Sequence, residues 1–330
     1  MTSLDRKLAS ILAGTYSPAD FVIADAKDAD LAFGVAAPGP LPGAQAAADG
    51  ESPFRSRPQY LQQMRDLVGQ GVLDILLASA SNGERLAAEG VFAGSDVTLA
   101  VRANDTTDIW HPRGASYAHH PSRPFRTAEL EQIRPFCDLV LYSITLNNDV
   151  ERDLATLNGY AQFRREAQVL GLRHFLEVFN PNAPTDLEHS EVGRFVNDSI
   201  IRALAGVTAA HRPLFLKLAY NGPAALAELV GHDPSLVVGL LGGSAGTTRD
   251  TFELLDQGQR HGARVSLFGR KIQRAESQLD LVALMPQVLA GKLSPEQAVR
   301  SYHGTLQGHG LAPHRSLEDD LRITEPALRH

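Results

Sequence analysis

The feature that most constrains the fold is a regular alternation of short apolar segments with segments of helical periodicity. Each apolar segment is too apolar for a strand with one face in water, which is typical of buried strands in a parallel sheet. Eight strand–helix units close most naturally into a (β/α)₈ barrel, with an open doubly wound sheet as the structural alternative. The apolar segments are residues 21–25, 72–78, 97–103, 137–143, 173–179, 213–219, 236–242 and 264–269.

The same alternation predicts a single domain over all 330 residues. Two long loops, residues 34–58 and 104–127, each follow a predicted strand. Loops that follow strands gather at the catalytic face of a barrel, so we expect both to act as lids or specificity loops. A polar extension after residue 311 is expected to pack on the outside of the barrel or on a partner subunit.

Composition narrows the classes of partner. A net charge of −7 and a pI near 5.9 disfavour nucleic acid and anionic membranes, both of which attract basic proteins. No apolar run approaches the ~18 residues that a membrane span needs, so we expect no membrane anchor and no signal peptide. The single cysteine, Cys137, excludes an intrachain disulfide framework and fits a reducing compartment, which predicts the cytoplasm.

Lys217 is the strongest candidate for a catalytic residue. It lies inside the apolar segment PLFLKLA, residues 213–219, and a closed barrel has no edge strand on which it could reach solvent. Burial disfavours the charged form of an amine, and a neutral amine is the nucleophile that imine formation requires. The alternative is a structural lysine paired with a carboxylate inside the barrel.

Glycine-rich loops follow the seventh and eighth predicted strands. The segment GLLGGSAGTTRD, residues 239–250, places glycines before a predicted helix, and glycines allow backbone N–H groups to approach an anion. Barrels commonly bind phosphate after these two strands. The alternative is that the glycines only make tight turns. The candidate anion-binding residues are Gly242, Gly243, Ser244, Gly269 and Arg270.

Three segments together resemble a known family. FLKLAYNG (215–222), GLLGGSAGT (239–247) and GARVSLFGRKI (262–272) are similar to the corresponding segments of archaeal-type class I fructose-bisphosphate aldolases, a group related to deoxyribose-phosphate and tagatose-bisphosphate aldolases. The resemblance covers the C-terminal third and is only topological before it. It implies a Schiff base on Lys217 and phosphate binding by Gly243, Ser244, Gly269 and Arg270.

The resemblance also implies an aspartate at the end of the first strand that transfers protons or orients substrate hydroxyls. Asp25 in FVIADAKDAD matches this position, while Lys27, Asp28 and Asp30 lie close enough to leave the assignment open. As an isolated residue, Asp25 would more often be a loop or cap residue.

The fifth strand departs from the family pattern. These aldolases carry a proton-donating tyrosine there, whereas FLEVFNPN, residues 175–182, gives Phe179, which transfers no proton. Glu177 lies two residues earlier on the same strand face and is the nearest replacement. Its alternative role is a salt bridge to Lys217 or Arg102. Tyr142 is a second candidate donor, with core packing as its alternative.

Polar residues close the third strand, and no residue spacing points to a metal. Arg102 and Asn104 are candidate substrate anchors, with surface turn residues as the alternative. The histidines have no metal-ligand spacing, and Schiff-base chemistry needs neither a metal nor another cofactor. We therefore expect no cofactor.

These features predict a class I aldolase-like lyase that makes or breaks a C–C bond in a phosphorylated sugar or keto substrate through Lys217. One alternative keeps the lysine for acyl transfer, as in thiolases, or for a sugar-condensing synthase. Another is a barrel that binds a phosphorylated metabolite without catalysis. Barrel aldolases are often oligomeric, which predicts a homo-oligomer.

Overall fold

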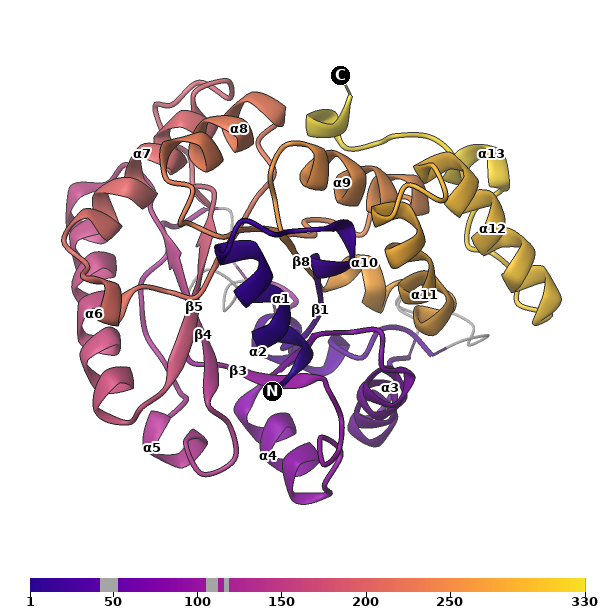
Figure 1. Ribbon diagram of the computed structural model, residues 1–330, viewed down its shortest axis with the longest axis horizontal. Helices are drawn as coiled ribbons and strands as arrows, with labels where there is room; N and C mark the ends of the chain where they lie inside the picture. The colour runs from indigo at the N-terminus through magenta and orange to yellow at the C-terminus, as the bar shows by residue number, and fades with distance from the viewer. Residues whose placement is uncertain (42–52, 105–111, 116–118, 330) are drawn as a thin grey trace.

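The protein is a closed barrel of eight parallel strands that neighbour one another in sequence order. The computed structural model describes residues 1–41, 53–104, 112–115 and 119–329. The helices surround the barrel, as Figure 1 shows, so the predicted (β/α)₈ fold is confirmed. The strands are β1 Val22–Lys27, β2 Ile75–Ala78, β3 Thr98–Arg102, β4 Leu139–Thr145, β5 Arg173–Phe179, β6 Leu216–Leu218, β7 Val238–Leu241 and β8 Val265–Phe268.

Helices follow the strands as a parallel sheet requires, with additional short helices at both ends of the chain. The α-helices are α1 Ser3–Leu12, α2 Asp30–Phe33, α3 Arg57–Gln70, α4 Ala80–Ala88, α5 Leu130–Ile133, α6 Val150–Val169, α7 Val192–Ala205, α8 Pro223–His232, α9 Thr248–Arg260, α10 Arg270–Gln273, α11 Gln278–Leu289, α12 Pro295–Gly308 and α13 Leu317–Asp320. The 3₁₀ helices are η1 Pro18–Asp20, η2 Gly34–Ala36, η4 Ala209–His211 and η5 Pro326–Leu328.

Successive side chains of each strand alternate between two separate apolar cores. One core fills the barrel interior and includes Phe175 and Phe215, whose rings stack with centroids 4.6 Å apart. The other core lies between the strands and the outer helices and includes Leu176 and Leu216. This alternation decides which residue of each strand faces the inside of the barrel.

Helix α1 closes the amino-terminal end of the barrel. Its residues Leu4 and Leu8 are buried in the interior core rather than in the outer one. Lys7 donates a hydrogen bond to Asp74 at 2.7 Å, just before β2, which fixes the helix against the strand ends. Helix α1 therefore covers the amino-terminal end of the barrel interior, and barrel enzymes form their active sites at the opposite end, in the loops that follow the strands.

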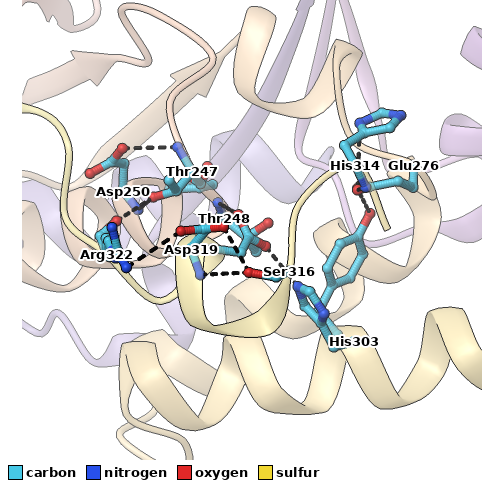
Figure 2. A network of polar contacts seen from close by, with 12 residues as sticks. Thr247, Thr248, Asp250, Glu276, His303, His314, Ser316, Asp319 and Arg322 are labelled. Carbon is cyan, nitrogen blue, oxygen red and sulfur yellow. Dashed lines mark hydrogen bonds and ion pairs between the residues drawn. The ribbon is translucent and has the colours of Figure 1, made fainter. Parts of the chain in front are cut away.

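The C-terminal extension packs on the outside of the barrel, which is one of the two arrangements expected from the sequence. The N-cap residue of α9, Thr247, donates through its hydroxyl to the carbonyl of Arg322, and the backbone N–H of Thr248 donates to Asp320 at 2.8 Å. Figure 2 shows this network at the start of α9. The extension thus lies over the β7–α9 loop.

The long loops are only partly within the described residues. In the first, Pro40 and Phe54 form an isolated antiparallel bridge on either side of residues 42–52, which lie outside the described part of the chain. In the second, residues 105–111 and 116–118 also lie outside it. A role for these loops as lids therefore stays a prediction. In the described residues, no helix is long and apolar enough to cross a membrane.

Candidate active site

Neighbouring strands place polar side chains in one layer of the barrel interior, above the apolar core. The register aligns Ser143 of β4 with Glu177 of β5, and Glu177 with Lys217 of β6. Arg102 at the end of β3 and Asp28, just after β1, join them through ion pairs and hydrogen bonds. We call these five residues the inner polar cluster.

Glu177 connects the two cations of this cluster. One of its carboxylate oxygens, Oε1, forms an ion pair with Lys217 Nζ. The other, Oε2, accepts a hydrogen bond from Ser143 Oγ at 2.8 Å and lies 3.5 Å from Arg102 Nη1. Both salt-bridge alternatives for Glu177 are therefore present together. Because it contacts the lysine nitrogen directly, Glu177 is also placed for proton exchange with Lys217.

Arg102 is anchored on three sides. It donates from Nη1 to Asp28 Oδ2 at 2.8 Å, from Nη2 to Ser143 Oγ at 3.0 Å and from Nε to the Asn104 carbonyl at 3.0 Å. Asn104 in turn pairs with both backbone groups of Ser143. A side chain held this firmly acts as a fixed positive charge, and Arg102 is not a surface turn residue.

The inner polar cluster is buried and its charges balance. Lys217 is 5% exposed, Glu177 1% and Arg102 2%. With two cations and two carboxylates, each charge has an opposite partner, which is the condition for burying ions without a large free-energy penalty. The lysine is thus buried as expected, but it is paired, so the ion pair must open or exchange its proton before Lys217 can act as a nucleophile.

The structure corrects the placement of Asp25. Its register partners are Leu76 and Phe268, both members of the outer core, so its side chain points away from the barrel interior. Asp28, three residues later, points inward and contacts Arg102. Within the first strand segment, the carboxylate of the interior is therefore Asp28.

Asp25 instead forms a buried ion pair with Lys27 behind the barrel wall, 3.1 Å apart. Lys27 Nζ also donates to Gln273 Oε1 at 2.6 Å and to Gln278 Oε1 at 2.8 Å. Burial raises the pKa of Asp25 to about 6, against the opposing effect of Lys27. The pKa of Lys27 is lowered by the same burial. This pair joins β1 to α10 and α11. In the described residues it forms no hydrogen bond or ion pair with the inner polar cluster, although the nearby charge of Asp28 is a smaller cause that raises the pKa of Asp25.

The β7–α9 loop has the backbone expected of an anion-binding loop. Gly243 and Gly246 have φ of +66° and +60°, a conformation that glycine adopts without strain. Among the described residues, no acceptor pairs with the backbone N–H groups of residues 243–246. A cavity of about 880 Å³ adjoins this loop and is lined by Ser244, Arg270 and Arg274, among others. These are the donors and charges that an anion would need.

Part of this predicted site is engaged by the C-terminal extension. Glu325 accepts hydrogen bonds from Ser244 Oγ at 2.9 Å and from the buried Lys271 Nζ at 2.8 Å. The hydroxyl of Ser244 therefore already has a carboxylate partner. Arg270 is exposed, and its guanidinium carbon lies 5.9 Å from the centroid of the Phe33 ring.

Gly242 and Gly269 lie where the backbone is closely packed. A Cβ atom at Gly242 would come within 3.3 Å of the Phe268 ring, and one at Gly269 within 3.2 Å of the Ala26 carbonyl oxygen. A side chain at either position would crowd these neighbours, which favours glycine where β7, β8 and β1 pack together. This supports the tight-turn alternative for them without excluding nearby anion binding.

The strand parity also places Phe179, which stands where the resemblance implies a tyrosine, and Tyr142, the second candidate proton donor. Phe179 aligns with Thr145 at the end of β5, two residues beyond Glu177 on the same face. Tyr142 points outward, where its ring stacks on Phe163 of α6 with centroids 4.3 Å apart. Tyr142 therefore does not face Lys217, and core packing explains its ring. Glu177 is the candidate donor that contacts the lysine.

Sequence reasoning missed three residues of these sites. Ser143 had a signal, because it is the polar residue that ends an apolar strand on the same parity as Leu139 and Leu141. Lys271 and Glu325 had none, because they are far apart in the chain and only packing of the extension brings them together.

No family model matches the sequence, and no curated protein matches it. Among solved structures, a Schiff-base-forming fructose-1,6-bisphosphate aldolase matches with TM-score 0.62 and 15% identity, covering 87% of this chain and 99% of that chain. An archaeal fructose 1,6-bisphosphate aldolase gives 0.62 at 17% identity, covering 87% and 99%. The fructose-bisphosphate aldolase from Slackia heliotrinireducens gives 0.64 at 15% identity, covering 95% and 92%. The chain therefore shares the barrel fold of archaeal-type fructose-bisphosphate aldolases, which the sequence resemblance predicted.

Proposed function

We propose that the protein is a class I aldolase-like lyase that acts on a phosphorylated sugar or keto substrate through a Schiff base on Lys217. The observation that carries this proposal is the direct contact between Lys217 Nζ and the Glu177 carboxylate, inside a barrel closed at its other end by α1. An amine and a group that exchanges protons with it are the minimum that imine chemistry needs.

The proposed steps conserve protons within this pair. Glu177 accepts a proton from the Lys217 ammonium, and the neutral amine attacks the carbonyl carbon of the substrate. A proton then moves from the nitrogen to the former carbonyl oxygen, which gives a carbinolamine. Protonated Glu177 donates its proton to the departing hydroxyl, water leaves, and an iminium forms. Glu177, again a carboxylate, then takes the proton of the substrate hydroxyl on the carbon that will leave. That carbon departs as a carbonyl, and the electron pair of the broken C–C bond passes to the iminium, which becomes an enamine.

Arg102 and Asp28 are proposed to hold this pair in position and to bind substrate hydroxyls. Arg102 places a fixed positive charge 3.5 Å from Glu177 and, together with Ser143, holds this carboxylate in position. The unpaired N–H groups of residues 243–246 support binding of the substrate phosphate at the β7–α9 loop. A phosphate that bound Ser244 Oγ there would compete with Glu325 for this hydroxyl.

Borohydride trapping tests the proposal. The protein is incubated with phosphorylated ketoses and with short aldehydes and ketones, then reduced, and adducts are mapped by peptide mass spectrometry. We expect an adduct on Lys217 that Lys217→Ala abolishes. Lys292→Ala is the matched control, because Lys292 is an exposed lysine whose loss should leave trapping unchanged. Binding of phosphate esters without any carbonyl adduct would instead support the noncatalytic barrel.

A second candidate keeps Lys217 but changes the reaction to lysine-dependent acyl transfer or sugar condensation. Phe179 favours it, because these aldolases carry a proton-donating tyrosine on the fifth strand and this chain does not. Product analysis separates the two: aldol cleavage releases two carbonyl fragments from one substrate, whereas acyl transfer or condensation consumes a second substrate.

A further inference from the structure

A cavity of about 560 Å³ lies on the outer side of β4, between α6 and the segment 123–126. It is separate from the inner polar cluster, because its floor is Tyr142, whose side chain points away from the barrel interior. Of the described residues that line it, three are arginines, Arg123, Arg126 and Arg152, and none is acidic.

Two polar groups of this cavity have no partner among the described residues. Tyr142 is 4% exposed, and its hydroxyl lies beside Gly159 and Pro124, which both line the cavity. Burial raises the pKa of the Tyr142 hydroxyl, and the positive charge of Arg126 lowers it. In the described part of the chain, no group forms a hydrogen bond with this hydroxyl. The Nη1 atom of Arg126 is also buried and unpaired, while Nη2 contacts Glu166. A buried polar atom without a partner is rare, so Arg126 Nη1 calls for a ligand or a water.

One face of α6 completes the cavity. Arg152, Ala155, Gly159 and Gln162 recur at intervals of three and four residues and all line it. At Gly159 a Cβ atom would lie 3.1 Å from the Tyr142 hydroxyl, so the glycine allows this close approach. Neither Arg123 nor Arg152 has a side-chain ion pair with another described residue. Both guanidinium groups are available to an anion.

We propose that this cavity binds a small phosphate monoester, with its phosphate on the arginines and the Tyr142 hydroxyl. Guanidinium groups present paired donors that match phosphate oxygens, and a tyrosine hydroxyl adds a neutral donor. The amide side chain of Gln162 offers hydrogen bonds to hydroxyl groups of the organic part. Phe125 and Phe163 provide apolar contact for its carbon skeleton.

The cavity is joined to the candidate active site through one strand. Tyr142 of β4 faces the cavity, and the next residue, Ser143, faces inward and donates to Glu177. Asn104 lines the cavity and also accepts from and donates to the backbone of Ser143. The phosphate ester is thus placed to act as an effector of the inner polar cluster. Its binding does not depend on the reaction proposed for Lys217.

Calorimetry combined with hydrogen exchange tests the proposal, with glycerol 3-phosphate as the probe and glycerol and inorganic phosphate as comparison ligands. We expect glycerol 3-phosphate to protect the backbone amides of residues 152–163 from exchange. Tyr142→Phe and Arg152→Gln should each weaken this binding about tenfold, as loss of one charged or buried hydrogen bond does. Protection by inorganic phosphate but not by glycerol would assign the affinity to the phosphate group.

Matched variants separate the cavity from stability and from the active site. The ring of Tyr160 neighbours that of Tyr142, but the hydroxyl of Tyr160 pairs with His174, so Tyr160→Phe removes a hydroxyl that already has a partner. Arg165→Gln removes an exposed arginine of α6. Both should leave binding unchanged. Protection confined to residues 243–248, equal affinity in Tyr142→Phe, Arg152→Gln and wild type, or no binding at millimolar probe would each overturn the proposal.

Discussion

At the scale of residues, the proposed chemistry depends on how the Glu177 carboxylate divides its contacts. Glu177 gives one oxygen to Lys217 and the other to Ser143 and Arg102. The second oxygen fixes the side chain, so the first is held against the lysine nitrogen without needing to move. A carboxylate that contacted only Lys217 would be free to rotate away when the lysine reacts.

Glu177→Gln should therefore slow imine formation while preserving the shape of the interior. Glutamine accepts a hydrogen bond but no proton, and loss of a general acid–base group typically costs 10²- to 10⁴-fold in rate. Single-turnover trapping on Lys217, followed over time, measures this step. Thr145→Ser, a conservative change at the end of β4, serves as the control. A trapping rate within a fewfold of wild type in Glu177→Gln would assign proton transfer to another group.

The buried pair of Asp25 and Lys27 predicts a pH dependence of stability. The folded pKa of Asp25, about 6, lies above its usual 3.8 because of burial, so the folded state binds a proton that the unfolded state has lost. The wild-type protein should thus lose stability as pH rises between these values, by on the order of 1 to 3 kcal/mol. Asp25→Asn should lack this change.

Denaturant unfolding at pH 4, 5, 6 and 7 measures the difference between wild type and Asp25→Asn. A constant difference over this range would mean that Asp25 is already ionised in the folded state at low pH. Trapping of a carbonyl on Lys217 should be the same in both proteins, since in the described residues Asp25 forms no hydrogen bond or ion pair with the inner polar cluster.

At the scale of elements, the start of α9 is held by the end of the chain. Asp250 closes a capping box with Thr247 and also accepts from the backbone N–H groups of Thr324 at 2.8 Å and Glu325 at 3.2 Å. Burial opposes the charge of Asp250, but these hydrogen bonds outweigh it and lower its pKa. The same contacts position Glu325 against Ser244 and Lys271.

Asp250→Asn should destabilise the fold by about 2 to 4 kcal/mol, because an amide donor would face backbone donors that then lack an acceptor. Asp319→Asn is the matched control: in the first turn of α13, Asp319 accepts a hydrogen bond from the hydroxyl of the N-cap residue Ser316, but it is exposed, and the change should cost less than about 1 kcal/mol. The free energy of unfolding in urea distinguishes the two. Equal costs would show that the extension adds nothing at α9.

At the scale of the whole molecule, the helix that closes the barrel and the candidate active site lie at opposite ends of the barrel. Helix α1 fills the amino-terminal end with Leu4 and Leu8, while the inner polar cluster and the β7–α9 loop lie toward the carboxyl ends of the strands. A change at one end can therefore be made without touching the other. Assembly into a homo-oligomer and location in the cytoplasm stay predictions.

Leu4→Ala should lower the free energy of unfolding by about 2 to 5 kcal/mol, as removal of a fully buried leucine side chain does. Trapping on Lys217 should be unchanged at temperatures where the variant is folded. Leu12→Ala, at the exposed end of the same helix, is the control and should cost little. A loss of trapping in folded Leu4→Ala would mean that the two ends of the barrel are coupled.

The sequence alone determined the fold, the strands and the position of Lys217. Buried parallel strands are apolar on both faces, and that pattern does not depend on distant contacts, so all eight strand segments could be identified from it. For the same reason, a lysine inside such a strand had to be buried. The glycines of the β7–α9 loop were equally readable, because a positive φ limits the choice of residue locally.

Only the tertiary structure decided which charged groups meet. A strand that is apolar on both faces does not reveal which face is inside, so Asp25 and Asp28 could not be told apart until the register placed Asp25 beside Leu76 and Phe268. The contact of Glu325 with Lys271 joins segments 54 residues apart and depends on how the extension packs. Ion pairs of this kind leave no periodic pattern in the sequence, since they are set by the closure of the barrel and the path of the chain over it.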